Sequence, residues 1–129
     1  MPDVRKKILV VEDDMDIAFM VRSRLESDGY DVHIVHSGEA GWEKIKAEPP
    51  DLVVLDVMLP GVNGYEICAR IKEDAALSLP VVMLTSNHRQ TDEMRGAMVK
   101  ADSYIRKPMS AQMLLPEIKR LLNEKKVGP

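Results

Sequence analysis

The strongest constraint on the fold is an alternation between short, fully apolar runs and longer segments with helical spacing. Residues 8–11 and 52–55 contain no polar side chain, which is typical of parallel strands that are buried on both faces. The segments between such runs place apolar residues at intervals of three and four, as an amphipathic helix does. Because parallel strands need crossover connections, usually helical, the alternation predicts an α/β protein.

The alternation extends along the whole chain without an internal repeat. We expect strands at residues 8–11, 30–35, 52–55, 80–84 and 104–105, each followed by a helix, with the fourth helix at about 91–99. Asp14 and Ser37 are predicted N-caps, and Gly29 stands where a helix should end. The apolar face of the helix between Asp14 and Gly29 would be formed by Ile17, Met20, Val21 and Leu25. Five such units predict a flavodoxin-like (βα)5 fold, a doubly wound parallel sheet of order 2-1-3-4-5 in a single domain.

Composition narrows the class of protein. A length of 129 residues fits one domain, and the single cysteine, Cys68, excludes an intrachain disulfide, which fits the cytoplasm. No apolar run approaches the length of a membrane span. Net charge is −3, and basic residues cluster only near the ends, so a nucleic-acid surface is not expected. We expect one domain at residues 7–123, with tails at 1–6 and 124–129.

Acidic residues follow two of the predicted strands directly. Glu12 and Asp13 come after the first strand, and Asp56 ends the third. In the predicted strand order these strands are neighbours, so their carboxylates should converge at one edge of the sheet. Each close pair then costs roughly 1–4 kcal/mol of repulsion. Such crowding needs positive charge, and oxygen ligands alone favour Mg²⁺ over zinc.

Two further polar residues are expected at the same edge. Thr85 ends the fourth strand and Lys107 follows the fifth. Taken singly, Asp56 could be a turn-capping residue, Lys107 a solvated lysine and Thr85 a residue that merely suits a strand. Asp14 is explained by N-capping alone. Together, the residues at this edge favour a site over these separate structural explanations.

The ordered set of motifs resembles the receiver domain of bacterial response regulators, in particular the single-domain chemotaxis type. The resemblance extends from about Lys7 to Leu122. The motifs are Val10-Val11-Glu12-Asp13-Asp14, Leu55-Asp56-Val57-Met58-Leu59-Pro60-Gly61, Asn63-Gly64, Leu84-Thr85-Ser86 and Tyr104-Ile105-Arg106-Lys107-Pro108.

The resemblance implies a role for each matching residue. Asp56 would be the phosphoryl acceptor, and Mg²⁺ would be held by Glu12, Asp13, Asp56 and the backbone carbonyl of Met58. Thr85 would hydrogen-bond the acyl phosphate, Lys107 would pair with its charge, and Tyr104 would move with Thr85 on activation. The Lys107–Pro108 peptide bond is expected to be cis.

The same resemblance implies partners. A sensor histidine kinase or a histidine phosphotransfer protein would donate the phosphoryl group. A downstream protein would bind the face formed by the fourth helix, the fifth strand and the last helix. Such a domain catalyses its own phosphorylation and dephosphorylation but acts as a switch. Because no output domain follows Leu122, we expect either a stand-alone regulator or a piece of a larger protein.

Three other functions fit the sequence less well. A hydrolase of the haloacid-dehalogenase type needs a second acid two residues after the nucleophile, where this chain has Met58. A flavodoxin-type carrier needs a glycine- and hydroxyl-rich loop after the first strand, whereas Glu12 and Asp13 would repel the flavin phosphate. The nearest alternative is a binding module of the same fold that works without phosphorylation. Such modules usually lose the acceptor, the acidic pair or the lysine, and this chain keeps all three.

Pro116 interrupts the pattern of the last helix. Beyond the first turn, a proline cannot donate a hydrogen bond to the carbonyl one turn back, here that of Gln112. We therefore expect a kink, or an irregular first turn, between Ser110 and Glu117.

Overall fold

The predicted alternation of strands and helices is present in the computed structural model, which describes residues 5–85, 101–107 and 110–125. The strands are β1 (Lys7–Val11), β2 (Asp31–Val35), β3 (Leu52–Asp56), β4 (Val81–Thr85) and β5 (Ser103–Arg106). The helices are α1 (Met15–Ser27), α2 (Gly38–Ala47), α3 (Gly64–Glu73) and α5 (Ala111–Lys125). The helix expected at 91–99 lies outside the described residues.

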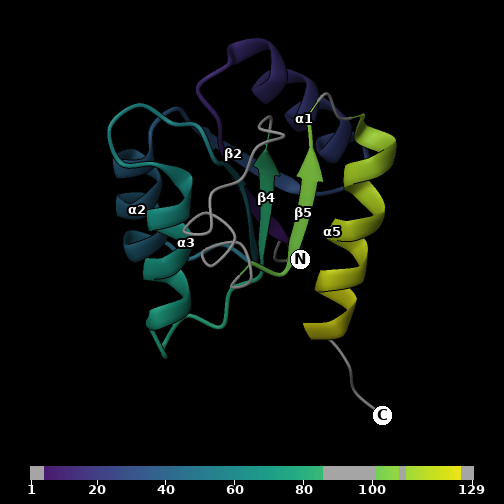
Figure 1. Cartoon of the computed structure of the whole chain (residues 1–129). Helices are drawn as coiled ribbons and strands as arrows, with labels where there is room; N and C mark the ends of the chain where they lie inside the picture. Colours follow the sequence, from purple (N-terminus) through teal and green to yellow (C-terminus); the bar gives the residue numbers. More distant parts are fainter. Residues whose placement is uncertain (1–4, 86–100, 108–109, 126–129) are drawn as a thin grey trace.

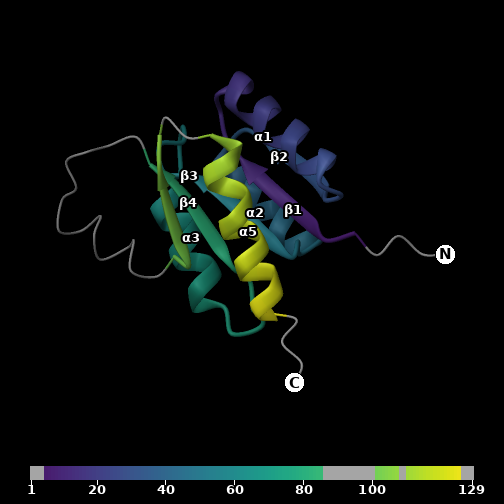
Figure 2. The same cartoon turned by 90° about the vertical axis from the view of Figure 1, so that its right-hand side faces the viewer.

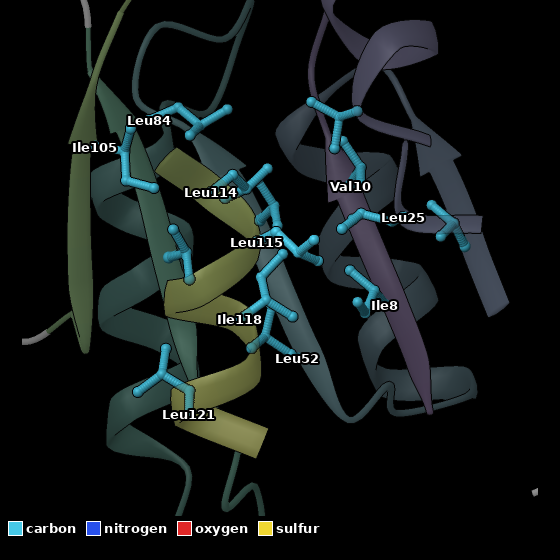
Figure 3. Close-up of a cluster of buried hydrophobic side chains, with 14 of the residues drawn as sticks. Ile8, Val10, Leu25, Leu52, Leu84, Ile105, Leu114, Leu115, Ile118 and Leu121 are labelled. Carbon is cyan, nitrogen blue, oxygen red and sulfur yellow. The ribbon is translucent and has the colours of Figure 1, made fainter. Parts of the chain in front are cut away.

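The strands form one parallel sheet of order β2-β1-β3-β4-β5, which confirms the predicted topology. Helices α1 and α5 cover one face, and α2 and α3 cover the other (Figures 1 and 2). Strand residues alternate between these faces, so Ile8 and Val10 join one core cluster while Leu9 and Val11 join the other. Figure 3 shows Leu114 and Ile118 of α5 pointing into the first cluster.

The predicted helix caps are confirmed. The side chain of Asp14 accepts hydrogen bonds from the backbone N–H groups of Asp16 and Ile17, and Ser37 accepts one from Ala40. Gly29, after α1, has a φ of +93°, a backbone conformation that glycine adopts more readily than other residues. The apolar face expected for α1 needs one correction, because Met20 is 39% exposed while Ala18 is buried. Periodicity indicates the direction of the apolar face but not how far burial extends around the helix.

Gly64, the first residue of α3, allows this helix to begin close to the end of β3. A Cβ atom at Gly64 would lie 2.1 Å from the backbone carbonyl oxygen of Asp56. Asn63 caps the helix by accepting a hydrogen bond from the N–H of Glu66. The loop between β3 and α3 is therefore held tightly where it rejoins the sheet.

Helix α5 is α-helical from Ala111 onward and contains Pro116 in its interior. No irregular first turn precedes the proline, so that alternative is wrong, and a kink at Pro116 stays a prediction. The carbonyl of Ser110 accepts hydrogen bonds from the N–H groups of both Met113 (3.0 Å) and Leu114 (3.2 Å). Pro116 has no N–H group, so it cannot donate the corresponding hydrogen bond to the carbonyl of Gln112.

We expect Pro116→Ala to raise the free energy of unfolding by about 1–3 kcal/mol, because alanine restores a donor for the Gln112 carbonyl and removes a steric clash. Greater freedom of the unfolded chain offsets part of this gain. Pro116 is exposed, so no core packing is lost. Urea unfolding measures the change. Gln112→Ala, another exposed position of α5, is the control and should change stability little. An unchanged or lower stability of Pro116→Ala would contradict the prediction.

Candidate functional site

The residues predicted to carry the chemistry meet at the carboxyl edge of the sheet. Glu12 and Asp13 follow β1, Asp56 ends β3, Thr85 ends β4 and Lys107 follows β5. All strands are parallel, so these ends lie on one side, marked by the arrowheads of β4 and β5 in Figure 1. Among the described residues, the buried polar or charged ones are Glu12, Asp56, Thr85 and Ser103, and the first three belong to this edge.

Three carboxylates form a cluster whose donor set suits a hard cation. One oxygen each of Glu12, Asp13 and Asp56 lies within 4.8 Å of the others. Glu12 and Asp56 are buried, whereas Asp13 is exposed to solvent. Mg²⁺ prefers oxygen ligands and keeps several of its waters, so a cluster open on one side fits this ion. The residues present are therefore compatible with the predicted metal.

Lys107 supplies positive charge inside this cluster. Its Nζ lies 2.9 Å from Oε1 of Glu12 and 3.2 Å from Oδ2 of Asp56. Burial alone would lower the pKa of Lys107, but the neighbouring Glu12 and Asp56 carboxylates outweigh burial and raise it. The ammonium group therefore remains charged between two buried acids.

Glu12 is the most perturbed acid of the site. Burial, with the nearby Asp56 carboxylate as a further contribution, raises the pKa of Glu12 to about 7, although Lys107 acts in the opposite direction. Its Oε2 accepts a hydrogen bond from the backbone N–H of Asp14 at 3.1 Å. In the absence of a metal, Glu12 thus holds a proton over a pH range in which an ordinary glutamate is ionised.

The carboxylate of Asp56 is oriented by two contacts. Its Oδ1 accepts a hydrogen bond from the backbone N–H of Met58 at 3.2 Å, and its Oδ2 faces Lys107. The Met58 side chain is exposed, so this residue takes part through its backbone. These two contacts hold the carboxylate in one orientation, and only 2% of the residue is exposed.

Thr85 and Tyr104 occupy neighbouring strands but differ in exposure. Thr85 is buried, and its carbonyl accepts a hydrogen bond from the N–H of Lys107 at 2.6 Å. Tyr104 of β5 is 37% exposed and is in register with Met83, two residues before Thr85. Thr85 is thereby linked to Lys107 through the backbone. The predicted cis bond between Lys107 and Pro108 lies outside the described residues.

One contact was missed by reasoning from sequence. Nδ1 of His36 lies 3.0 Å from the carbonyl oxygen of Glu12, so a histidine outside the predicted site touches the backbone of the acidic pair. The available signal was the strand order, because β2 and β1 are neighbours and His36 directly follows β2. The sequence also did not separate buried Glu12 from exposed Asp13.

Comparisons with known proteins match this chain to response regulators. Residues 8–119 match the family described as the response regulator receiver domain. The chain is 37% identical over 125 residues to the alkaline phosphatase synthesis transcriptional regulatory protein PhoP of Bacillus subtilis (strain 168), covering 97% of this chain and 52% of that protein. It is 36% identical over 121 residues to the phosphate regulon transcriptional regulatory protein PhoB of Rhizobium meliloti (strain 1021). This match covers 93% of this chain and 53% of that protein. The chain thus spans about half the length of these relatives.

A solved structure of similar fold is the signal receiver domain of a signal transduction histidine kinase from Syntrophus aciditrophicus. It has a TM-score of 0.86 and 30% sequence identity, covering 96% of this chain and 95% of that one. In the part of the chain that the structure describes, no helix is both long and apolar enough to cross a membrane. The chain belongs to the response regulator receiver domain family, whose general function is phosphorylation-activated signalling in two-component systems.

Proposed function

We propose that this chain is a switch in which Asp56 accepts a phosphoryl group with the help of Mg²⁺. The observation that carries the proposal is the convergence of three carboxylates with Lys107 at one edge of the sheet. If the ion pairs of Lys107 with Glu12 and Asp56 served stability alone, the exposed carboxylate of Asp13 beside them would have no role. A cation and a transferring phosphoryl group account for both the excess negative charge and the buried lysine.

In this proposal Glu12, Asp13, Asp56 and the backbone carbonyl of Met58 hold the metal ion. The donor set consists of oxygen atoms, as Mg²⁺ prefers. Bound Mg²⁺ would neutralise charge on the phosphoryl oxygens during transfer. The neighbouring Lys107 adds positive charge at Asp56, where a phosphoryl group would sit.

The phosphoryl donor would be a phosphohistidine of a sensor histidine kinase or of a histidine phosphotransfer protein. A carboxylate oxygen of Asp56 forms the new O–P bond while the P–N bond of the donor breaks, and the departing imidazole keeps the electron pair of that bond. Lys107 stabilises the negative charge on the transferring group, because its Nζ is 3.2 Å from Oδ2 of Asp56. The resulting aspartyl phosphate would later be hydrolysed within the same site, which makes the chain a reversible switch.

The signal would leave the site through Thr85. The hydroxyl of Thr85 would hydrogen-bond the phosphate, and Tyr104 would turn inward to follow it. The surface that changes would comprise β5 and α5, together with the fourth helix expected at about 91–99, which lies outside the described residues. A downstream protein would bind there. We place the domain at residues 7–123, with tails at 1–6 and 124–129, and its location in the cytoplasm. Cys68, the one cysteine of the sequence, is buried and forms no intrachain disulfide, which is compatible with that reducing compartment.

Asp56→Asn should abolish phosphorylation, because an amide is not a nucleophile for phosphoryl transfer. Incubation with acetyl phosphate and MgCl2 should add one phosphoryl group to the wild-type chain, measured as intact mass. Asp31→Asn is the matched control, since Asp31 lies on the edge strand β2 and faces His33. The control should be labelled as fully as wild type. Undiminished labelling of Asp56→Asn would show that another residue is the acceptor.

Thr85→Ala should still accept the phosphoryl group but fail to transmit it, because the hydroxyl that contacts the phosphate is gone. Amide chemical shifts of β5 and α5 before and after phosphorylation measure the transmission. Thr85→Ser keeps the hydroxyl and is the control, for which we expect shift changes close to those of wild type. A full response of these elements in phosphorylated Thr85→Ala would rule out coupling through the hydroxyl.

Clustered acids that would bind a cation should make the free energy of unfolding of the metal-free protein depend on pH. The pKa of Glu12 is raised from 4.5 to about 7, so between these values the folded state keeps a proton that the unfolded state has lost. The contribution of Glu12 to stability is thus fully present below pH 4.5 and decreases as pH rises through 7, by up to about 3 kcal/mol.

In EDTA, we expect the free energy of unfolding of wild type relative to Glu12→Gln to fall as pH rises across this window. Glutamine cannot ionise, so subtracting its pH profile removes the contributions of other carboxylates. Urea unfolding at several pH values measures the difference. If the two proteins have parallel profiles, Glu12 is not the buried, proton-holding acid that its surroundings indicate.

A further inference from the structure

The corner between β2 and α2, residues 35–38, contacts the chain segment that carries the acidic pair. The backbone carbonyl of Val35 accepts a hydrogen bond from the N–H of Glu12 at 3.0 Å. Nδ1 of His36 lies 3.0 Å from the carbonyl oxygen of Glu12. Because a carbonyl can only accept, this ring nitrogen carries the proton. Both polar groups of the Glu12 backbone are therefore held by two consecutive residues of the corner.

The same corner contacts the loop between β3 and α3, which carries Met58. Gly38 begins α2, and a Cβ atom there would lie 2.3 Å from the backbone oxygen of Val62 and 3.3 Å from Cγ1 of Ile67. Real Cβ atoms essentially never approach closer than 3.0 Å, so a methyl group would displace helix or loop by at least 0.7 Å. The obstacle is backbone, which cannot be relieved by rotating a side chain.

The surroundings direct this displacement toward the loop. Helix α2 is seated on β1 through Gly41, whose added Cβ would lie only 2.9 Å from Cγ2 of Val11. Its first turn is also fixed by the Ser37 cap, which accepts a hydrogen bond from the N–H of Ala40 at 3.1 Å. The helix can move away only by giving up this packing. Residues 58–62 of the loop between β3 and α3 are irregular backbone that precedes the tight contact at Gly64.

We propose that His36 and Gly38 are positioning residues for the Mg²⁺ site. His36 holds the backbone of the acidic pair, and Gly38 allows α2 to seat the loop that brings in the Met58 carbonyl. Neither residue would touch the ion. This inference rests on the proposed function, since it assumes that Mg²⁺ binds at Glu12, Asp13 and Asp56. Mg²⁺ demands near-ideal octahedral geometry, so a shift of the loop that carries the Met58 carbonyl would leave this ligand poorly placed to bind it.

The first test is a titration of the metal-free full chain with MgCl2, followed by the amide chemical shifts of Asp13 and Met58, with urea unfolding measured in parallel. Gly38→Ala should weaken Mg²⁺ binding by about 10-fold or more. Gly29→Ala is the matched control. Its φ of +93° strains any larger residue, but an added Cβ meets nothing within 4 Å. Gly29→Ala should therefore lose stability without changing Mg²⁺ affinity.

A second set of variants does not depend on Gly38→Ala being folded. His36 is exposed, so His36→Ala should keep the fold while it weakens Mg²⁺ binding several-fold. His36→Asn retains an N–H donor at the same branch position and should restore most of the affinity. His33→Ala removes a histidine of β2 that faces Asp31, and should bind Mg²⁺ as wild type does. If His36 had a purely structural role, the loss of Mg²⁺ affinity in His36→Ala would be accompanied by a loss of stability in urea unfolding.

The outcomes separate the two proposals. If wild type shows no response to MgCl2, the proposed function fails. If wild type binds Mg²⁺ and folded Gly38→Ala and His36→Ala bind it equally well, the positioning role is overturned and the proposed function stands. If Gly38→Ala does not fold, His36→Ala with its asparagine rescue decides: reduced binding restored by asparagine supports the inference, and unchanged binding overturns it.

Discussion

The attraction between one ammonium group and two buried carboxylates holds the functional edge of this protein together. Glu12 follows β1 and Asp56 ends β3, and the Nζ of Lys107 reaches both at 2.9 and 3.2 Å. Without the lysine, two nearly inaccessible acids would face each other in a medium that penalises charge. The long aliphatic stem of lysine lets a residue that follows β5 deliver its charge across β4. The ends of β1, β3 and β5 are thereby connected by one side chain.

The charge of Lys107 does not balance the three carboxylates of the cluster, and the remaining negative charge is what would attract a cation. The ammonium group contacts two of the three clustered carboxylates, and the raised pKa of Glu12 has the same origin as the affinity proposed for a cation. Burial and negative neighbours disfavour the ionised acid, and a divalent ion would relieve both effects. Such local conflict is typical of sites where stability is given up for function. Around this edge the scaffold is packed closely, with backbone touching backbone at Gly38 and Gly64.

Much of the fold could be read from local patterns. The five strands, the order of the sheet and the caps at Asp14 and Ser37 were predicted, because apolar runs and capping residues act over short distances in the chain. The boundaries differed by one or two residues, as expected where strands end gradually. Met20 was assigned to the core and is exposed, since helical periodicity marks a face but not its width. Helix α5 accommodates Pro116 without an irregular first turn, because its apolar face packs on the sheet regardless of the missing donor.

The sequence by itself determined which residue types stand at the strand ends, and hence that acids, a hydroxyl and a lysine gather at one edge. It does so because short apolar runs separated by helical segments indicate a parallel sheet, whose strands all end at the same edge. Only the tertiary structure decided that Glu12 is buried while the adjacent Asp13 is exposed, and that Lys107 lies between Glu12 and Asp56. The contacts of His36 with Glu12 and of Gly38 with Val62 likewise join segments about two dozen residues apart. Such contacts depend on the spacing of whole helices and strands, which no local pattern specifies.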